Sequence, residues 1–74
     1  MARLTVWPNP ATEIVNIDGM GDDCQWQLYD CRGRVCLAGK GDRFAVGMLP
    51  TGMYLLRVVA PTGDMITTKI IIKR

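Results

Sequence analysis

The sequence contains no histidine and no serine, and its only glutamate is Glu13. Histidine is the commonest general base, and serine beside a base is a common nucleophile, so the side chains that most hydrolases use are missing. The glycines lie in turns between expected strands, whereas a phosphate-binding loop needs them between a strand and a helix. The sequence therefore predicts a protein that is not an enzyme, with no catalytic and no cofactor-binding residues.

Cysteine is sparse and irregularly spaced. Cys24, Cys31 and Cys36 are separated by six and then four residues. This spacing matches no zinc or redox motif, and no histidine is present to complete a metal site. Arg32 and Arg34 would favour the thiolate of Cys31, but a catalytic cysteine also requires a base. We interpret the three residues as thiols and expect any buried one to act as a small apolar side chain.

A second place to look for a metal is the segment 18–23, whose sequence is Asp-Gly-Met-Gly-Asp-Asp. A calcium loop of the EF-hand type places oxygen ligands at alternating positions and ends in a bidentate glutamate, and neither feature occurs here. We interpret the segment as a turn. The sequence thus predicts no metal-binding residues.

The sequence also lacks strong charge and long apolar runs. Its net charge is +2, and of its lysines and arginines only Lys69, Lys73 and Arg74 gather near one end, which does not indicate a nucleic-acid-binding surface. No apolar run approaches the ~20 residues that cross a bilayer, and no signal peptide precedes the first strand. Because strand residues follow Met1 so closely, we expect the chain to be a piece of a longer protein.

What the sequence does contain is β-strand patterning. Its 74 residues predict a single domain, 1–74, and a domain of this size buries about 60% of its unfolded surface. Strand-forming residues flank Pro61-Thr62-Gly63, where proline presets φ and glycine can adopt the left-handed conformation of a type I turn with a bulge. The pattern predicts a hairpin with strands Gly52–Ala60 and Met65–Lys73, in which Ala60 faces Asp64.

This register assigns each side chain of the hairpin to one of two faces, because side chains alternate along a strand. On the core face the pairs are Val58 with Ile66, Leu56 with Thr68 and Tyr54 with Ile70. On the other face the pairs are Arg57 with Thr67, Leu55 with Lys69 and Met53 with Ile71. The second face is mixed in polarity, so we expect it to meet water or a partner.

Five further strands are expected ahead of the hairpin. They cover Leu4–Trp7, Glu13–Ile17, Cys24–Tyr29, Val35–Ala38 and Arg43–Val46, with polar turns between them that include 39–42. Pro8 and Pro10 stop the first strand, which we expect at a sheet edge. By alternation, Val15, Ile17, Trp26 and Leu28 should join the hairpin residues Tyr54, Leu56, Val58, Ile66, Ile70 and Ile72 in the core. Seven short strands without a helical period predict an all-β fold, a small immunoglobulin-like antiparallel β-sandwich.

The predicted pairing of the third and fourth strands also places the thiols. Tyr29 should face Cys36, and Cys24 should fall near Gly41. Cys24 and Cys36 would then lie farther apart than the ~4.4 to 6.8 Å between Cα atoms that a disulfide requires. We therefore expect no disulfide between that pair, and we expect any crosslink to join two molecules through Cys31.

Three pieces of the sequence, in order, carry a resemblance to a known family. They are Pro8-Asn9-Pro10-Ala11, Leu28-Tyr29-Asp30 with Gly33-Arg34-Val35, and Leu49-Pro50-x-Gly52-x-Tyr54-Leu55-Leu56. A turn glycine, Gly63, a lysine, Lys69, and an apolar strand, Ile70–Ile72, follow the last piece. In this order and spacing, over nearly all of its length, the chain resembles the type A C-terminal sorting domain of type IX secretion cargo proteins of Bacteroidetes.

The resemblance implies a secretion signal fused behind a larger passenger, which a signal peptide first sends to the periplasm. Outer-membrane translocation machinery would recognise the domain and carry the passenger to the outer membrane, the cell surface or the extracellular space. A sortase-like protease usually removes such a domain, here before Met1 or within the first residues. The matching positions expected to be recognised are Pro50, Gly52, Tyr54, Gly63, Lys69, Ile70, Ile72 and Lys73.

Purely structural roles compete for the same residues. Gly52 and Gly63 could serve only to permit positive φ, Tyr54 to fill the core and Pro50 to stiffen a link. An outward Lys69 has no such packing role.

The competing function is a non-catalytic adhesion or carbohydrate-binding sandwich that is retained on the mature protein. Alternation leaves only Tyr29 and Trp7 outside the core, which is few for a surface that stacks on sugars. A weak homodimer is a further alternative. The passenger, the cleavage point and the recognised surface stay open.

Overall fold

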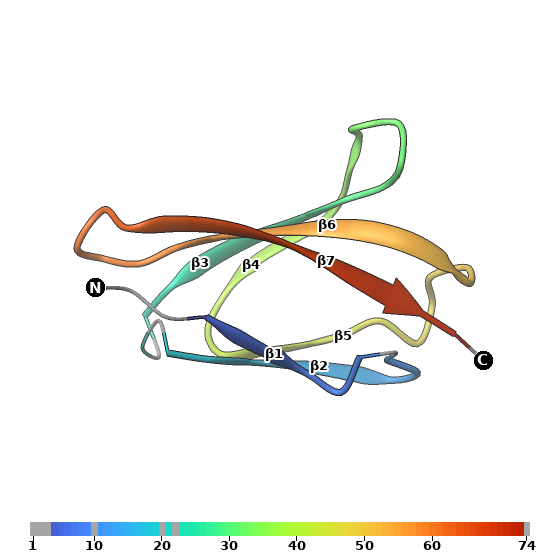
Figure 1. The fold of residues 1–74 in the computed structure, drawn as a ribbon, viewed down its shortest axis with the longest axis horizontal. Coiled ribbons are helices and arrows are strands. Elements are labelled where there is room, and N and C mark those ends of the chain that lie inside the picture. Colours follow the sequence, from blue (N-terminus) through green and yellow to red (C-terminus); the bar gives the residue numbers. More distant parts are fainter. Residues whose placement is uncertain (1–3, 10, 20, 22, 74) are drawn as a thin grey trace.

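The computed structural model describes residues 4–9, 11–19, 21 and 23–73, and it is built entirely from β-strands (Figure 1). The strands are β1 (Thr5–Trp7), β2 (Ile14–Asp18), β3 (Gln25–Tyr29), β4 (Val35–Lys40), β5 (Arg43–Ala45), β6 (Gly52–Val59) and β7 (Met65–Ile72). The described residues include no helix that could cross a membrane.

The strands form two antiparallel sheets that lie face to face (Figure 1). One sheet has three strands in the order β1-β2-β5, and the other has four in the order β4-β3-β6-β7. The chain passes between the layers after β2, after β4 and after β5. The predicted immunoglobulin-like β-sandwich of seven strands is therefore confirmed, as is the edge position of β1.

The hairpin of β6 and β7 has the predicted register. Tyr54 pairs with Ile70, Leu56 with Thr68 and Val58 with Ile66, and the three outward pairs agree as well. The turn closes through hydrogen bonds that the Ala60 N–H donates to the Asp64 carbonyl at 2.8 Å and the Gly63 N–H donates to the Ala60 carbonyl at 2.9 Å. Gly63 has a φ of 96°, in the left-handed region that the turn requires.

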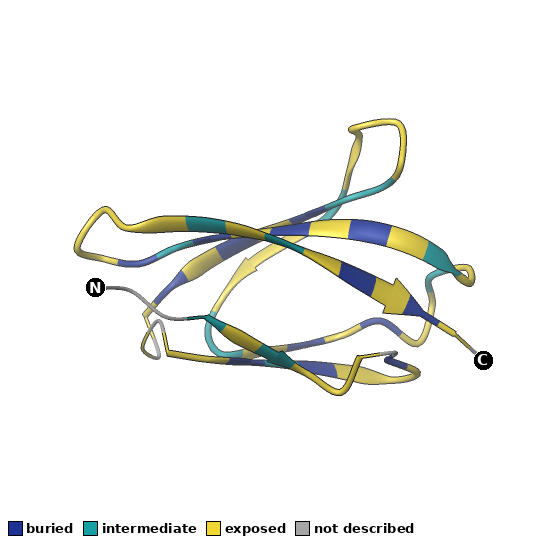
Figure 2. Ribbon diagram, viewed as in Figure 1, coloured by how far each residue is buried: buried dark blue, intermediate teal, exposed yellow. Residues whose placement is uncertain are grey.

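Buried and exposed residues alternate along β6 and β7, which places the core on one face of the hairpin (Figure 2). Nine of the ten predicted core residues are buried, and Ile66 is the exception because it is only half-buried. Since β7 is the edge strand of its sheet, one flank of Ile66 has no neighbouring strand. The other buried hydrophobic residues of the core are Ala11, Cys24, Phe44, Val46 and Ala60.

Two features of β4 differ from prediction. Tyr29 faces Val35 rather than Cys36, because the register shifts at a bulge beside Tyr29. The strand also continues through Gly39 and Lys40, which were predicted to lie in a turn. Gly39 pairs with Trp26, and a Cβ atom at Gly39 would lie 2.7 Å from the Trp26 indole, so the missing side chain makes room for that ring.

The remaining differences are small shifts at strand ends. Strands β1, β2 and β3 each begin one residue later than predicted, β2 also ends one residue later, and β5, β6 and β7 each end one residue earlier. Pro10, which was predicted to help stop the first strand, lies outside the described residues.

Leu56 and Leu55 are neighbours on opposite faces of β6, so they provide a matched test of the register. Leu56→Asp should unfold the domain, because it forfeits ~2 kcal/mol of apolar burial and adds the cost of desolvating a carboxylate. A small domain has only about 5 kcal/mol to lose. Leu55 is exposed, so Leu55→Asp should leave a cooperative unfolding transition. Urea unfolding followed by circular dichroism measures both, and equal destabilisation by the two variants would contradict the register.

Candidate functional site

The last strand, β7, is held along its outer edge by a side chain from the other end of the chain. The Nδ2 atom of Asn9 donates a hydrogen bond to the Lys69 carbonyl at 3.4 Å, and the Ile71 N–H donates one to Oδ1 of Asn9 at 3.0 Å. The amide group thus offers one donor and one acceptor to the strand, as a neighbouring β-strand would.

Ala11 continues this contact through its backbone. Its N–H donates to the Ile71 carbonyl at 2.8 Å, and its carbonyl accepts from the Lys73 N–H at 2.9 Å, which makes a short parallel bridge with β7. The Ala11 side chain is fully buried. The first piece of the family pattern and the terminal strand, about sixty residues apart in sequence, therefore form one structural unit.

The piece Leu49-Pro50-x-Gly52-x-Tyr54 forms the corner where the chain enters β6. The Tyr54 hydroxyl donates a hydrogen bond to the Pro50 carbonyl at 2.7 Å while its ring lies in the core. This is the arrangement of a tyrosine corner, which ties a strand to the backbone just ahead of it. Pro50 and Tyr54 thus have a structural role in shaping the corner.

The two glycines of the predicted site differ in their backbone conformation. Gly63 has positive φ, so the structural interpretation holds for it. Gly52 does not have positive φ, so the interpretation of Gly52 as a φ requirement is wrong. A Cβ atom at Gly52 would contact only the Tyr54 ring, at an ordinary 3.8 Å. Nothing in the fold of the described residues therefore requires glycine at this position.

The structure brings some of the eight predicted recognition residues together and separates others. Tyr54, Ile70 and Ile72 are buried, and Gly52 is half-buried beside Ile72, its partner in the sheet. The exposed members are Pro50, Gly63, Lys69 and Lys73. Gly63 lies in the turn at the far end of the hairpin, about 25 Å from Gly52 at ~3.3 Å per residue. A partner that touches the surface could contact only the exposed members directly.

Asn9 and Ala11 belong to the same unit, but prediction gave them no role. The feature of the sequence that could have indicated a role for Asn9 and Ala11 is the position of β7 as the last strand. A last strand at a sheet edge leaves backbone donors and acceptors unpaired, and proteins commonly cover such an edge. An asparagine between two prolines, with one donor and one acceptor on its side chain, is suited to that task.

The loop between β3 and β4 stands away from the sandwich (Figure 1) and carries the exposed Cys31. Oδ1 of Asp30 accepts hydrogen bonds from the backbone N–H groups of Arg32 at 2.8 Å and Arg34 at 3.0 Å. These bonds, that of Arg34 first, hold the pKa of Asp30 below its ordinary value. The ionised carboxylate therefore orders the loop, and this contribution falls away as the pH drops through the lowered pKa.

No two of the three cysteines form a disulfide in this structure. Cys24 is buried and lies beside Gly41, as predicted: its Sγ donates a hydrogen bond to the Gly41 carbonyl at 3.1 Å. Cys36 is half-buried near the bulge of β4.

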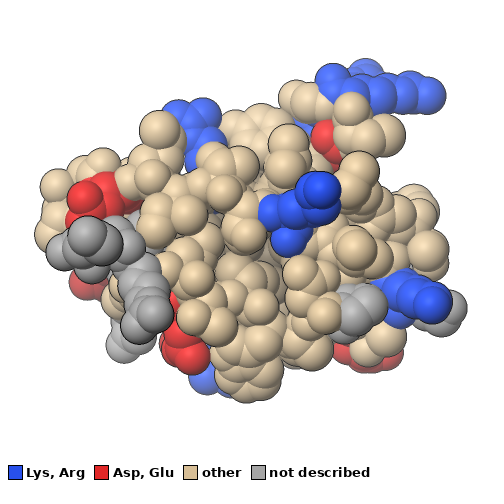
Figure 3. Space-filling model, in the orientation of Figure 1, with Lys and Arg blue, Asp and Glu red and all other residues tan. Residues whose placement is uncertain are grey.

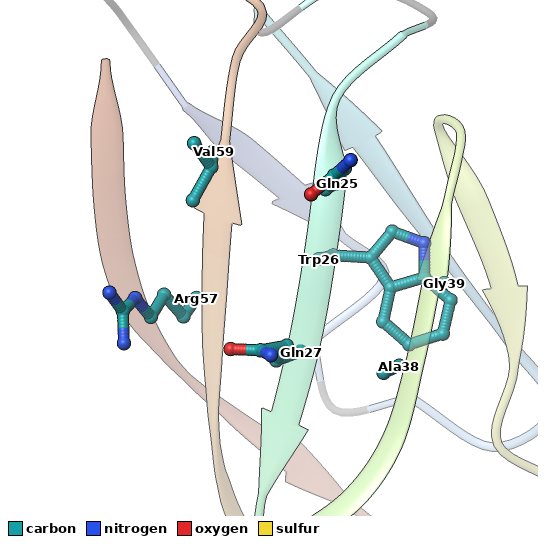
Figure 4. Close-up of a pocket in the computed structure, with 7 residues that line it drawn as sticks. All are labelled: Gln25, Trp26, Gln27, Ala38, Gly39, Arg57 and Val59. Carbon is teal, nitrogen blue, oxygen red and sulfur yellow. The ribbon is translucent and has the colours of Figure 1, made fainter. Parts of the chain in front are cut away.

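A groove of about 270 Å³ lies on the outer face of the four-stranded sheet, where the side chains of Gln25, Gln27 and Arg57 line it (Figure 4). The Trp26 indole extends away from this face beside Gly39 (Figure 4) and stacks on Phe44 with ring centroids 4.0 Å apart. Trp26, Ala38, Gly39 and Val59 complete the lining of the groove. Only 7% of Trp26 is exposed, so the groove offers little aromatic surface to a sugar.

The two outer aromatic residues do not supply such a platform either. Trp7 belongs to the three-stranded sheet and Tyr29 to the four-stranded sheet. Within the described ranges no group of His, Cys, Asp and Glu could hold a metal ion. Met20 and Asp22, two residues of the segment weighed for calcium, lie outside those ranges.

Charged residues are dispersed over the visible face of the molecule (Figure 3). Blue and red groups are separated by broad areas of uncharged surface, and no extended patch of one sign covers this face. This distribution fits a net charge of +2 and offers no continuous basic track for nucleic acid. Arg74, part of the predicted basic end, lies outside the described residues.

Comparison with known proteins identifies a family and finds similar proteins. The family model described as "Secretion system C-terminal sorting domain" matches residues 5–73. Beta-agarase D of Zobellia galactanivorans is 32% identical over 72 residues, which is 95% of this chain but only 15% of that protein. A solved structure of PorZ, described as an essential bacterial surface component of the type-IX secretion system of Porphyromonas gingivalis, has the same fold. It superposes with a TM-score of 0.74 at 19% identity, over 96% of this chain and 11% of PorZ.

Asn9→Ala should loosen the outer edge of β7. It removes two hydrogen bonds, each contributing about 1 kcal/mol, and it should speed amide hydrogen exchange at Ile71. Asn9→Asp is the matched control, because it keeps the acceptor for the Ile71 N–H but loses the donor to Lys69. Ile71 should therefore stay protected in Asn9→Asp. Unchanged exchange at Ile71 in Asn9→Ala would show that the amide does not hold the strand.

Proposed function

This chain belongs to the family of secretion system C-terminal sorting domains, and from that membership we propose how it acts. As a type IX sorting signal it directs export to the outer membrane or cell surface. In our proposal the secretion machinery recognises the folded domain through its last hairpin, after a passenger fused ahead of it has reached the periplasm. The recognised positions are Pro50, Gly52, Tyr54, Gly63, Lys69, Ile70, Ile72 and Lys73.

The observation that carries this proposal is the way β7 is anchored. Ile70 and Ile72 are fully buried in the core, and Asn9 and Ala11 hold the outer edge of the strand. The Lys69 side chain is exposed on the face of β7 opposite Ile70 and Ile72, while its carbonyl accepts the hydrogen bond from Asn9. The buried members of the predicted set would therefore act by fixing the strand, and the exposed members by contact with the machinery.

The size of the domain supports the proposal of a passenger that is later released. The chain corresponds to 15% of the length of Beta-agarase D, so a domain of this kind can be a small part of a much larger protein. Because β1 begins at Thr5 and pairs with β2, a cut by a sortase-like protease ahead of Thr5 would leave the sandwich intact. The passenger would then be released without unfolding the signal.

Truncation tests whether the last strand is needed for export. A reporter fused ahead of the intact domain, in a host with type IX machinery, should reach the cell surface. Deleting 70–74 removes two buried isoleucines as well as the Lys73 contact with Ala11, so the reporter should stall in the periplasm. Cell fractionation and surface labelling measure both pools. If the truncated fusion is exported as efficiently as the intact fusion, a binding module retained on the mature protein becomes the better interpretation.

Lys69→Ala separates recognition from folding. Lys69 is exposed and pairs with the exposed Leu55, and a surface truncation of this kind usually shifts stability by less than about 0.5 kcal/mol. We expect a folded domain with reduced export of the same reporter. A folded Lys69→Ala variant that is exported at the intact level would show that recognition does not depend on this side chain.

Association of two copies is proposed to occur through the thiol of the β3–β4 loop. Cys31 is exposed, whereas Cys24 is buried, so only the former can readily meet a second molecule. A non-reducing gel of oxidised protein should show a dimer band that Cys31→Ser abolishes and Cys24→Ser retains. A dimer band that persists in Cys31→Ser would refute the assignment.

A further inference from the structure

The outer face of the four-stranded sheet carries an unusual concentration of exposed apolar side chains. Of the eight large hydrophobic residues that are exposed among the described residues, five lie on this face. Four of these, together with the half-buried Tyr29, occupy the end of the face that holds Lys69. We call this set the apolar patch: Tyr29, Val35, Met53, Leu55 and Ile71.

The register makes the apolar patch continuous across all four strands. Met53 pairs with Ile71, Leu55 pairs with Tyr29 on one side, and Tyr29 pairs with Val35. Directly paired side chains have Cβ atoms about 4.5 to 5.5 Å apart. Met53 and Leu55 lie two residues apart on the same face of β6, so the two rows of pairs adjoin. On its other side Leu55 pairs with Lys69, which places a cation against the patch.

Charge on these four strands has only one sign. Strands β3, β4, β6 and β7, all of whose residues are described, contain Lys40, Arg57 and Lys69 and no aspartate or glutamate. The three-stranded sheet differs, because Asp18 lies on β2 and Arg43 on β5. A partner surface that carries carboxylates therefore complements the four-stranded sheet but not the three-stranded one.

The anchoring of β7 restricts how a partner can approach. Asn9 and Ala11 occupy the backbone groups of residues 69, 71 and 73 on the outer edge, so a partner strand cannot pair there. The side chains of the face stay accessible. A second copy of the same face is a poor occupant, because it would bring Lys69 and Arg57 of the two molecules together.

We infer that the apolar patch and Lys69 form the surface that binds the secretion machinery, and that the partner is an apolar protein surface rimmed with carboxylates. This inference rests on the proposed function. It assigns contact roles to Tyr29, Val35, Met53 and Leu55, none of which belongs to the predicted recognition set. Burial of such a patch supplies the affinity, and the pairing of Lys69 with a carboxylate fixes the orientation.

Matched variants on the two sheets test the inference. Leu55→Asp and Lys69→Glu change the patch, whereas Ile14→Asp and Arg43→Glu make the same changes of charge on the outer face of the other sheet. Ile14 and Leu55 are 45% and 43% exposed, so these two substitutions are closely comparable. In the reporter fusion, both patch variants should lower the surface pool at least about tenfold, a 1.4 kcal/mol effect. Both controls should stay within about twofold of the intact domain.

The outcomes separate this inference from the proposed function. If the intact fusion is not exported, the proposed function fails. A second outcome has three parts: the intact fusion is exported, the 70–74 deletion stalls, and the folded patch variants are exported like the intact domain. In that case the proposed function stands and the inferred surface is wrong. Urea unfolding checks folding, and Leu55→Gln replaces Leu55→Asp if that variant unfolds. A dimer in sedimentation velocity that Leu55→Asp dissociates would assign the patch to a second copy and overturn the inference.

Discussion

The contact between Asn9 and the edge of β7 is the interaction on which the rest of the structure depends. Asn9 follows β1 in the three-stranded sheet, and β7 closes the four-stranded sheet. The hydrogen bonds of Asn9 and Ala11 therefore join the two layers along one side of the sandwich. Without them, β7 would present a long row of free donors and acceptors, which is the usual starting point for pairing between molecules.

The same contact explains why residues far apart in sequence form one signal. The two isoleucines of β7 fill the core from one side of the strand, and Asn9 and Ala11 cover its edge. Only the outward side chains remain for a partner. An unfolded chain would present none of these side chains in a fixed arrangement, which is why our proposal assigns recognition to the folded domain.

Much of the hairpin could be predicted because its register depends on residues that are close together in the sequence. The Pro61-Thr62-Gly63 turn and the alternation of side chains give the register, and the register places Lys69 outward. The bulge near Cys36 and the strand conformation of Gly39 could not be predicted in this way. Gly39 favours a turn by its own preference, but it pairs with Trp26 in β4, where the absence of a side chain leaves room for the indole.

The candidate site was predictable to a smaller extent, because it depends on the order of the strands. The tyrosine corner and the buried isoleucines follow from motif and alternation. The contact of Asn9 with residues about sixty positions away, and the continuity of Tyr29 and Val35 with Leu55, require the order β4-β3-β6-β7. Alternation alone assigns a face to each side chain but does not say which strands are neighbours.

The alternation also shows how so small a domain can be both stable and specific. In β6 and β7 the even-numbered residues face the core and the odd-numbered residues face outward. The side chains that fill the core and those that the proposed partner would contact thus lie on opposite faces of the same strands. Changes on the outer face leave the packing of Leu56 and Ile70 intact, so the proposed contact surface could vary without loss of the fold. In so small a domain the inner faces of the two sheets make up the whole core. The outer faces of the strands are therefore where side chains can contact a partner without disturbing the core.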